Sequence, residues 1–321
     1  MNLRKKINRL SKLKTNKVFG KSFFLFLLLI LFLAVGFFSM VGCEKKEEKV
    51  KVPSFNLSQK AKHLTSLPPV IRVLLLGSDS RTESIEGRSD SIILVQIDRE
   101  KKRLSLVSFP RDSRVYIPGY GYNKINSAMA TGGPQLTKKT IENLTGLSID
   151  YYAVTTFIGF KKIISNLDGV TVTLERPVHD RWAKAYLSAG RQRLGPFEAL
   201  ALARARHLGN GDFTRAFHQQ VILKGLFAEH QPRASWSELL FYLPVIFKNC
   251  QTSISPWEAF LLLRAAAEIP PSSFEHLVLK GSTGSRGGVS YVFLDENFQE
   301  EVFARLKERK SLSDLANQQV R

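Results

Sequence analysis

Three runs of aliphatic residues follow one another in the first half of the chain, at 70–77, 91–98 and 104–109. Each is rich in Val, Ile and Leu and has the length of a strand, which predicts three consecutive β-strands. Short connections place consecutive strands side by side and favour antiparallel pairing. The pattern therefore predicts an antiparallel meander.

Helical and strand patterns alternate after the meander. We expect strands at 149–155, 170–174 and 275–279, and helices at 134–144, 158–167, 196–206, 213–228, 236–248, 256–267 and 297–310. Pro134 is expected to start its helix and Gly146 to stop it, while Asp212 is the expected N-cap of the helix at 213–228. The mixture predicts an α/β class fold: a single mixed-sheet α/β(α) sandwich domain over residues 70–310, with flanking helices. We expect the tail at 311–321 to fray.

The N-terminal region has a different composition. Residues 1–22 contain eight Lys and Arg and no acidic residue, and residues 23–42 are apolar and uncharged. An uncharged helix of this length spans the hydrocarbon core of a bilayer, about 30 Å. The positive-inside rule then leaves residues 1–22 in the cytoplasm. We therefore expect a single-pass membrane protein with one N-terminal transmembrane helix and its domain on the extracytoplasmic face.

The residues after the apolar run allow a second route to the membrane. Met40-Val41-Gly42-Cys43 resembles a lipoprotein cleavage box, in which the Cys would be lipidated. The apolar run is longer than the usual signal-peptide core, which favours an uncleaved anchor. Residues 43–69 are charged and interrupted by proline, as expected for a polar spacer. Only Cys250 follows, so the folded region has no intrachain disulfide framework.

The chain is strongly basic, with 47 Lys and Arg against 28 Asp and Glu and a formal net charge of +19. Such a balance suits nucleic acid, anionic lipid headgroups or phosphorylated substrates. An extracytoplasmic domain without a recognisable nucleic-acid motif argues against a nucleic-acid partner. Phosphate chemistry at the membrane remains.

The predicted meander brings three candidate functional residues to one edge of the sheet. Asp79 directly follows the first strand, Asp90 directly precedes the second, and Arg111 follows the third. Antiparallel strands put these three positions at the same edge. Two carboxylates completed by water and phosphate oxygens make a typical Mg²⁺ site. Asp also shapes loops without any ligand, so each carboxylate alone allows a purely structural interpretation.

A second basic cluster occupies 204–215. Arg204 and Arg206 lie at the end of a predicted helix, where a favourable interaction with the helix dipole is the simplest interpretation. Two residues apart, they reach one ligand only if the helix ends there. Arg215 and Gln219 share a face near the start of the next helix, where anions bind. Asp212 is an alternative partner for Arg215.

These motifs resemble the LytR–CpsA–Psr family of bacterial envelope proteins. The resemblance extends from about Val73 to Gln220 and rests on LLLGSDSR, GRSDSIILV, VSFPRDSRVYIPG, KINSAMATGG, IDYYAVTTFIGF, LDGVTVTL, LGPFEALALARAR and GDFTR. Several separated motifs in the family's order make the match specific. Beyond Gln220 only a general helix and strand pattern remains.

The resemblance implies a Mg²⁺-assisted phosphotransferase, with Mn²⁺ as an alternative ion. Such an enzyme moves a glycopolymer phosphate from a polyprenyl-pyrophosphate carrier to a sugar hydroxyl of peptidoglycan. It also implies an apolar lipid tunnel, which helices 158–167 and 196–203 could line, although core packing explains most of their apolar residues. Asp79 and Asp90 would hold the metal. The resemblance assigns the pyrophosphate to the side chains of Arg81, Arg88, Arg111, Arg204, Arg206, Asp212, Arg215 and Gln219, and the catalytic role to the two metal carboxylates with Arg111, Arg204, Arg206 and Arg215.

Three positions depart from the family pattern. His218 and His207 stand where the family usually has further cations, and Met129 replaces an aromatic residue. A histidine at position 218 would give a weaker or pH-dependent phosphate contact. Two other functions are alternatives. A polyprenyl-pyrophosphate lipid hydrolase needs the same residues, whereas intact Asp79, Asp90, Arg111 and Arg215 argue against an inactive membrane-tethered envelope-binding or regulatory module. The glycopolymer, the acceptor sugar, the general base and the oligomeric state have no signature in the sequence.

Overall fold

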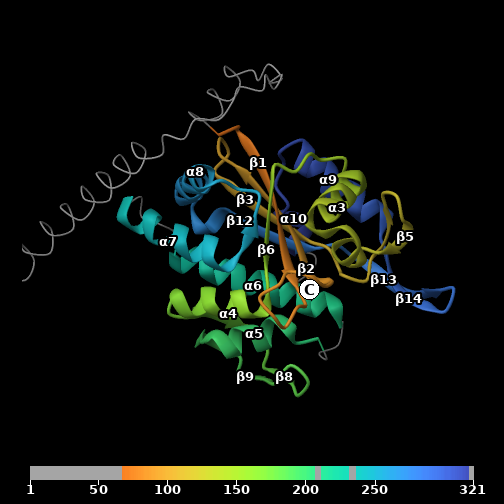
Figure 1. The fold of residues 1–321 in the computed structure, drawn as a ribbon, viewed down its shortest axis with the longest axis horizontal. Coiled ribbons are helices and arrows are strands. Elements are labelled where there is room, and N and C mark those ends of the chain that lie inside the picture. The colour runs from red at the N-terminus through yellow and green to blue at the C-terminus, as the bar shows by residue number, and fades with distance from the viewer. Residues whose placement is uncertain (1–66, 207–210, 231–235, 318–321) are drawn as a thin grey trace, which may run out of the picture. The chain divides into compact units, whose positions relative to one another are not determined.

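A six-stranded mixed sheet forms the centre of the molecule (Figure 1). The computed structural model describes residues 67–206, 211–230 and 236–317. The anchor predicted at 23–42, Cys43, the spacer up to residue 66 and His207 lie outside the described residues. Among the described residues, no helix has the length and apolar character needed to cross a bilayer.

The predicted meander forms the middle of this sheet. β1 (Val70–Ser78), β2 (Ser89–Asp98) and β3 (Arg103–Ser108) pair antiparallel in sequence order. β6 (Tyr151–Thr155) joins β1 in parallel, and β12 (Phe274–Val278) joins β3 in parallel. The short β11 (Gln251–Thr252) completes the order β11-β6-β1-β2-β3-β12.

Both faces of the sheet are covered, because alternate residues of its strands enter different cores. In β2, Ile92 and Leu94 belong to one core and Ile93, Val95 and Ile97 to the other. The first core contains α3 (Ser127–Thr145), α9 (Glu296–Lys307) and α10 (Ser313–Asn317). The second contains α8 (Pro256–Ala267) and one face of α6 (Asp212–His230). The predicted α/β sandwich is confirmed.

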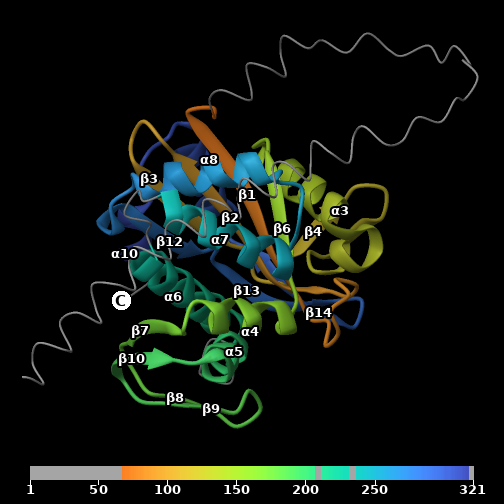
Figure 2. The same cartoon turned by 60° about the vertical axis from the view of Figure 1, so that its left-hand side comes forward.

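A third core lies beside the sandwich and holds the region of the late basic cluster (Figure 2). It packs α4 (Phe157–Asn166), α5 (Pro196–Arg204) and α6 against the hairpin of β7 (Val170–Leu174) and β10 (Gly190–Leu194). The hairpin of β8 (Val178–Asp180) and β9 (Ala185–Leu187) extends from it. α7 (Trp236–Asn249) packs against α4 and α8.

Several expectations need correction. α3 begins at Ser127 and is broken at Gly132 and Gly133, so the predicted helix at 134–144 is only its second part. α6 begins at Asp212, which is thus its first helical residue and not an N-cap. Residues 311–317, expected to fray, are ordered because Leu312 and Leu315 are buried and Glu275 accepts bonds from Ser311 and Leu312.

Short polar strands are the elements that the pattern missed. They form the hairpins of β4 (Arg114–Ile117) with β5 (Gly121–Lys124) and of β13 (Gly281–Arg286) with β14 (Val289–Leu294). β8 to β11, the one-turn helix at Pro271–Ser273 and α10 belong to the same group. These elements are only two to six residues long, which is too short for a period to be recognised in the sequence, even where a strand such as β4 or β8 alternates between buried and exposed positions.

Candidate active site

Arg111 lies at the centre of the predicted edge of the sheet. It follows β3, and its Nη1 donates to Oδ1 of Asp90 on β2 at 2.5 Å. Its backbone N–H donates to Oδ2 of Asp212 at 3.0 Å, and its Nε lies 3.6 Å from Oδ1 of the same carboxylate. Strand pairing brings Arg111 and Asp90 together, as the meander predicted. Asp212 joins them from α6, about one hundred positions along the chain.

Arg215 completes this group from inside the fold. Its side chain is 5% exposed and forms an ion pair with Asp212 one helical turn earlier. The alternative partner that the sequence allowed is therefore present. The same carboxylate contacts Arg111, so Asp212 joins two guanidiniums and does not simply neutralise one.

The charges of the group act on one another. Burial works against the Arg111 cation, but Asp90, Asp212 and Asp112 outweigh it and raise the pKa of Arg111. Burial lowers the pKa of Arg215, with Asp212 opposing that effect, and Arg206 is close enough to act on it as a like charge. Both groups stay charged, because an Arg is protonated throughout the physiological range. The result is a fixed set of cations that needs anions around it.

The end of α5 positions the other two arginines. α5 stops at Arg204 and Ala205 is extended, so Arg204 and Arg206 are free of the helical spacing that would point them apart. The backbone N–H of Arg206 donates to Oδ2 of Asp180 at 2.8 Å. The Arg204 guanidinium lies 5.3 Å from the centroid of the Phe157 ring. Both side chains are exposed, as a ligand contact requires.

The loop between β1 and β2 holds the other predicted carboxylate. Ser78 pairs with Ser89 across the strands, which places Asp79 at the same edge as Asp90. Oδ1 of Asp79 accepts the backbone N–H of Arg88 at 2.9 Å. Gly87 has a φ of +132°, and a Cβ there would overlap that oxygen. The loop therefore depends on glycine to hold the Asp79 carboxylate in place.

Two predicted side chains of this loop lie apart from the Arg111 group. The Arg88 side chain is exposed, and its backbone makes the contacts with Asp79. Arg81 is also exposed, and it lines a pocket with Arg204. These positions stay predictions for ligand binding.

Next to this cluster, an apolar cavity of about 230 Å³ lies between the sheet and helices α4, α5 and α6. Its walls are formed by side chains such as Leu75, Phe160, Ile163, Leu200, Ile222 and Leu226. Asp90, Arg204 and Gln219 are its charged or amide-bearing lining residues. Gln219 donates to the Ala203 carbonyl at 3.1 Å, which holds its amide there. The cavity thus joins apolar walls to the Arg and Asp cluster.

The cavity uses only one side of the helices expected to line a tunnel. Ile163 and Phe160 line it, whereas Ile164 is fully buried in the core beside it. Leu200 and Ala203 of α5 do the same, while Ala199 and Leu202 are core residues. Core packing is therefore confirmed for one face of each helix, while lipid binding along the other face stays a prediction.

His218 differs from its expected role as a pH-dependent phosphate contact. It is 7% exposed, and burial lowers its pKa to about 4 although the Ala205 backbone opposes the shift. It is therefore neutral at physiological pH. Met129 is likewise buried in the core, 4% exposed.

Two residues of the site were missed. Asp112 lies 3.8 Å from Arg111 Nε and 3.0 Å from Lys124 Nζ, and its neighbour Arg111 was the available signal. Asp180 is 1% exposed and holds the Arg206 backbone; nothing in its local sequence indicates that contact. Among the described residues, no three His, Cys, Asp or Glu form a metal-binding group. Asp79 and Asp90, at one edge of the sheet, stay a prediction for Mg²⁺, which takes most of its ligands from water and phosphate.

Comparison with known proteins supplies independent information. The model of the LytR_cpsA_psr family matches residues 38–308. Regulatory protein MsrR of Staphylococcus aureus (strain COL) is 38% identical over 204 residues, which cover 63% of this chain and 60% of MsrR. The alignment thus spans less than two thirds of that relative.

A second relative aligns over more of its length. The polyisoprenyl-teichoic acid–peptidoglycan teichoic acid transferase TagT of Bacillus subtilis (strain 168) is 29% identical over 287 residues, covering 85% of this chain and 88% of TagT. A solved structure of the family protein YwtF (TagT) contains bound octaprenyl pyrophosphate lipid. It matches with a TM-score of 0.60 and 28% identity, over 76% of this chain and 92% of that one.

Proposed function

The chain belongs to the LytR–CpsA–Psr family, and on that premise we propose that it is a membrane-tethered phosphotransferase. It moves a glycopolymer phosphate from a polyprenyl-pyrophosphate carrier to a sugar hydroxyl of peptidoglycan. The observation that carries the proposal is the apolar cavity that meets Asp90, Arg204 and Gln219. An apolar chain with a pyrophosphate at one end has the same two-part character. TagT, a transferase by name, and the structure that contains octaprenyl pyrophosphate support it.

The lipid part of the carrier would occupy the apolar cavity. Burying apolar surface stabilises a bound chain by roughly 25 cal/mol per Å². The walls come from β1, α4, α5 and α6, which are packed against the two cores of that side. This rigid seat would hold the pyrophosphate against the arginines at the cavity's charged end.

The arginines would bind the pyrophosphate and stabilise the negative charge that develops on it during transfer. Arg111 and Arg215 contact Asp90 and Asp212, Arg206 is close enough to Arg215 to act on it as a like charge, and Arg204 lines the cavity. A guanidinium offers two parallel N–H donors to phosphate oxygens. In phosphoryl transfer the protein mainly positions groups and stabilises charge on the equatorial oxygens. Donors already held by carboxylates need little reorganisation for that task.

In the transfer, one phosphorus–oxygen bond forms and another breaks. The acceptor hydroxyl oxygen attacks the phosphorus that carries the glycan, and the bond from that phosphorus to the bridging oxygen breaks. Polyprenyl phosphate leaves with the electron pair of the broken bond. The hydroxyl proton passes to a base, for which the Asp79 and Asp90 carboxylates are the candidates.

Asp79 and Asp90 would also hold Mg²⁺, or Mn²⁺ in its place, together with phosphate oxygens. Such an ion, when bound, neutralises part of the pyrophosphate charge. The Asp79 carboxylate is fixed by the Arg88 N–H and Asp90 by Arg111, so both present oxygens from defined positions.

A substitution that fills the apolar cavity tests whether the prenyl chain binds there. Ala153 of β6 lines the apolar cavity, so Ala153→Phe should take up space that the prenyl chain needs. We expect octaprenyl pyrophosphate to bind the full chain in detergent about tenfold more weakly after this change, because the cavity cannot expand without cost. Tryptophan fluorescence or calorimetric titration measures the affinity. Ala304→Phe, on the exposed side of α9, is the matched control.

The two outcomes are distinct. Weaker binding in Ala153→Phe alone supports the lipid seat. Equal affinity in both variants and the parent would show that the lipid binds elsewhere, which contradicts the proposal.

The name of MsrR favours a second candidate, a regulatory envelope-binding module. Such a module would bind the same lipid without turnover. Binding with no release of polyprenyl phosphate, in the presence of peptidoglycan and Mg²⁺, would identify it. Release of the glycan to water alone would identify a hydrolase.

A further inference from the structure

Two neighbouring helices expose large apolar side chains on the surface of the domain. Leu240 and Phe241 of α7 are 58% and 57% exposed, and Trp257 of α8 is 47% exposed. Pro244, one turn after Leu240, is exposed as well. Figure 2 shows α7 and α8 side by side at the front of the molecule, and the two helices pack against each other. We name these four residues the α7–α8 apolar surface.

The exposed side of α7 is unusual for a helix at a protein surface. Such a helix normally turns polar residues to solvent. α9 does so, because its exposed residues include Glu296, Glu300 and Lys307. Among the described side chains of α7, at 240–249, the exposed ones are the three of the apolar surface and Lys248. An exposed apolar face of this kind indicates a contact with an apolar partner.

The start of α8 holds Trp257 in a fixed position. The indole ring stacks on the buried ring of Phe260, with the ring centroids 5.4 Å apart. Ser255 and Glu258 form a capping box, and the Tyr151 hydroxyl donates to Oε1 of Glu258 at 2.9 Å. The first turn of α8 is thus tied to β6 of the central sheet. A ring held in this way loses little conformational freedom when it binds.

The exposed charges of the two helices have one sign. Lys248 lies in the last turn of α7 and Arg264 in the last turn of α8. No acidic side chain is exposed among the described side chains of these two helices. Apolar and Trp side chains bordered by cations are typical of a surface that binds the interface of a bilayer with anionic lipids. The charge pattern therefore favours a lipid surface as the partner.

The described chain begins beside α8. Leu67 is buried in the same core as Leu262 and Ala265 of that helix. Residues 43–66 separate Leu67 from the anchor predicted at 23–42, and a chain of this length reaches at most about 85 Å. An anchor at 23–42 would therefore keep α8 close to the bilayer. A tether of this kind raises the local concentration of one surface near the other, so that even a weak contact forms.

α7 also leads to the apolar cavity. The helix ends at Asn249, and the next residue, Cys250, lines the cavity together with Phe160 and Ile163 of α4. α7 packs against α4 as well. Contact of α7 with the bilayer would thus bring the cavity close to the surface in which a lipid carrier resides.

We propose that the α7–α8 apolar surface is a second membrane contact, which enters the headgroup region of the bilayer and fixes the orientation of the domain. Leu240, Phe241 and Trp257 would lie among the headgroups, and Lys248 and Arg264 would contact anionic lipids. Catalysis is not needed for this contact, so it applies to a transferase and to a regulatory module alike. A negative result would leave the proposed function intact.

Fluorescence quenching tests this contact, because the three tryptophans of the chain lie at 182, 236 and 257. Trp182→Phe/Trp236→Phe retains Trp257, and Trp236→Phe/Trp257→Phe retains Trp182. Each full chain is reconstituted into vesicles of phosphatidylglycerol and phosphatidylcholine brominated on its acyl chains. We expect the bromines to quench Trp257 at least about threefold more strongly than Trp182, because a ring at the interface lies next to the acyl chains.

Trp182 is the matched control for exposure. It is 66% exposed on the turn between β8 and β9, and Figure 2 shows these strands at the opposite end of the molecule from α8. Equal quenching of the two tryptophans would overturn the inference. A Trp257 shielded from brominated lipid and from aqueous iodide alike would show that protein covers it, either a second copy or residues 23–42. That result would also overturn the inference.

A further pair of variants tests the contribution of α7. In the chain that retains Trp257, Leu240→Gln/Phe241→Gln should reduce quenching about twofold or more, because a polar face no longer enters the interface. Tyr120→Gln/Val289→Gln is the control, since it removes one exposed aromatic and one exposed aliphatic residue from the β4–β5 and β13–β14 hairpins. It should leave quenching unchanged, and thermal unfolding verifies that both variants fold. Equal reductions in both would overturn the inference.

Discussion

Arg111 is the residue on which the geometry of the candidate active site depends most. It contacts Asp90 from β2, its neighbour Asp112 and Asp212 from α6. These carboxylates raise its pKa against the effect of burial, so its charge is secure. A guanidinium fixed in this way fits the requirement for a preorganised donor.

Arg111→Ala should lower turnover about 10²–10³-fold, because one preorganised charge donor is lost. Arg191→Ala, an exposed arginine of β10, is the control and should stay within twofold of the parent. Turnover is measured as product formed from a polyprenyl-pyrophosphoryl glycan, and thermal unfolding verifies that both variants fold. A properly folded Arg111→Ala protein with parental turnover would remove Arg111 from the site.

The buried histidines make a prediction about pH. Burial lowers the pKa of His218 and of His276 to about 4, from an ordinary value of 6.5. Between these values the unfolded chain binds protons that the folded chain does not. The free energy of unfolding should therefore fall as the pH drops from about 6.5 to about 4, by up to about 3 kcal/mol for each histidine.

Urea unfolding at several pH values measures the slope of the free energy of unfolding against pH. His218→Gln and His276→Gln should each reduce it by up to about one proton. His179→Gln, on the exposed face of β8, should leave it unchanged. Slopes that are identical in all three variants would show that the buried histidines do not account for acid sensitivity.

At the scale of elements, the loop between β1 and β2 connects fold and chemistry. Gly87 adopts a φ of +132°, and its missing Cβ leaves room for the Asp79 carboxylate. Any side chain at this position must displace that carboxylate. The loop therefore sets the position of one of the two proposed metal ligands.

Gly87→Ala should lower turnover more than tenfold and raise the Mg²⁺ concentration needed for half-maximal activity, because Asp79 moves. Backbone strain should also cost roughly 1–3 kcal/mol of stability. Gly121→Ala is a matched control, since Gly121 has a φ of +77° and no atom near its missing Cβ. Its stability should fall similarly while its turnover remains. Equal turnover losses in the two variants would mean that strain alone, and not Asp79, explains the effect.

Sequence periodicity predicted the buried elements well and the exposed ones poorly. β1, β2 and β3 each place alternate residues in two cores, which produces the aliphatic runs that identified them. The antiparallel pairing that those runs predict is enough to place Asp79, Asp90 and Arg111 at one edge of the sheet. The β8–β9 turn has no such pattern, because what fixes it is the buried Asp180 carboxylate and its long-range bond to Arg206.

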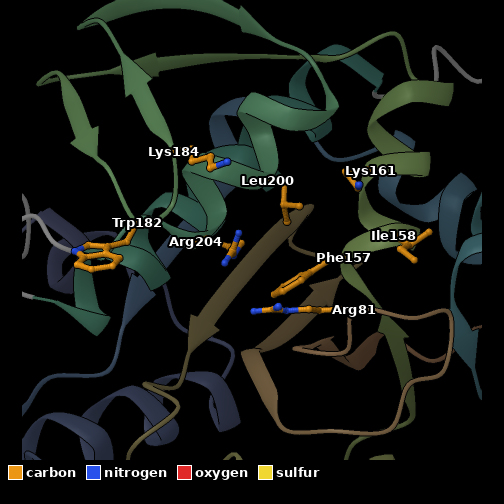
Figure 3. A pocket seen from close by; sticks show the side chains of 8 residues that line it. All are labelled: Arg81, Phe157, Ile158, Lys161, Trp182, Lys184, Leu200 and Arg204. Atoms are coloured by element: carbon orange, nitrogen blue, oxygen red, sulfur yellow. The ribbon is translucent and has the colours of Figure 1, made fainter.

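At the scale of the whole molecule, the cavities used in the proposed function lie on one side of the sheet and a packed core lies on the other. The apolar cavity and a second pocket, lined by Arg81, Lys161, Lys184 and Arg204 (Figure 3), lie among α4, α5, α6 and the hairpins beside them. The other face is packed with α3, α9 and the C-terminal residues. Glu275 of the edge strand β12 binds Ser311 and Leu312, so the end of the described chain closes that face. This packing brings motifs that are distant in sequence together on one side of the sheet.

The most direct test of the proposed transferase activity combines the full chain with a polyprenyl-pyrophosphoryl oligosaccharide, Mg²⁺ and peptidoglycan fragments. The products are analysed by mass spectrometry. We expect a glycan joined to peptidoglycan by a phosphodiester, together with released polyprenyl phosphate. Neither product should form when Mg²⁺ is omitted, and both should form about 10²–10³-fold more slowly in Arg111→Ala. Sugar phosphate released without any conjugate, or lipid bound without turnover, would contradict the transferase.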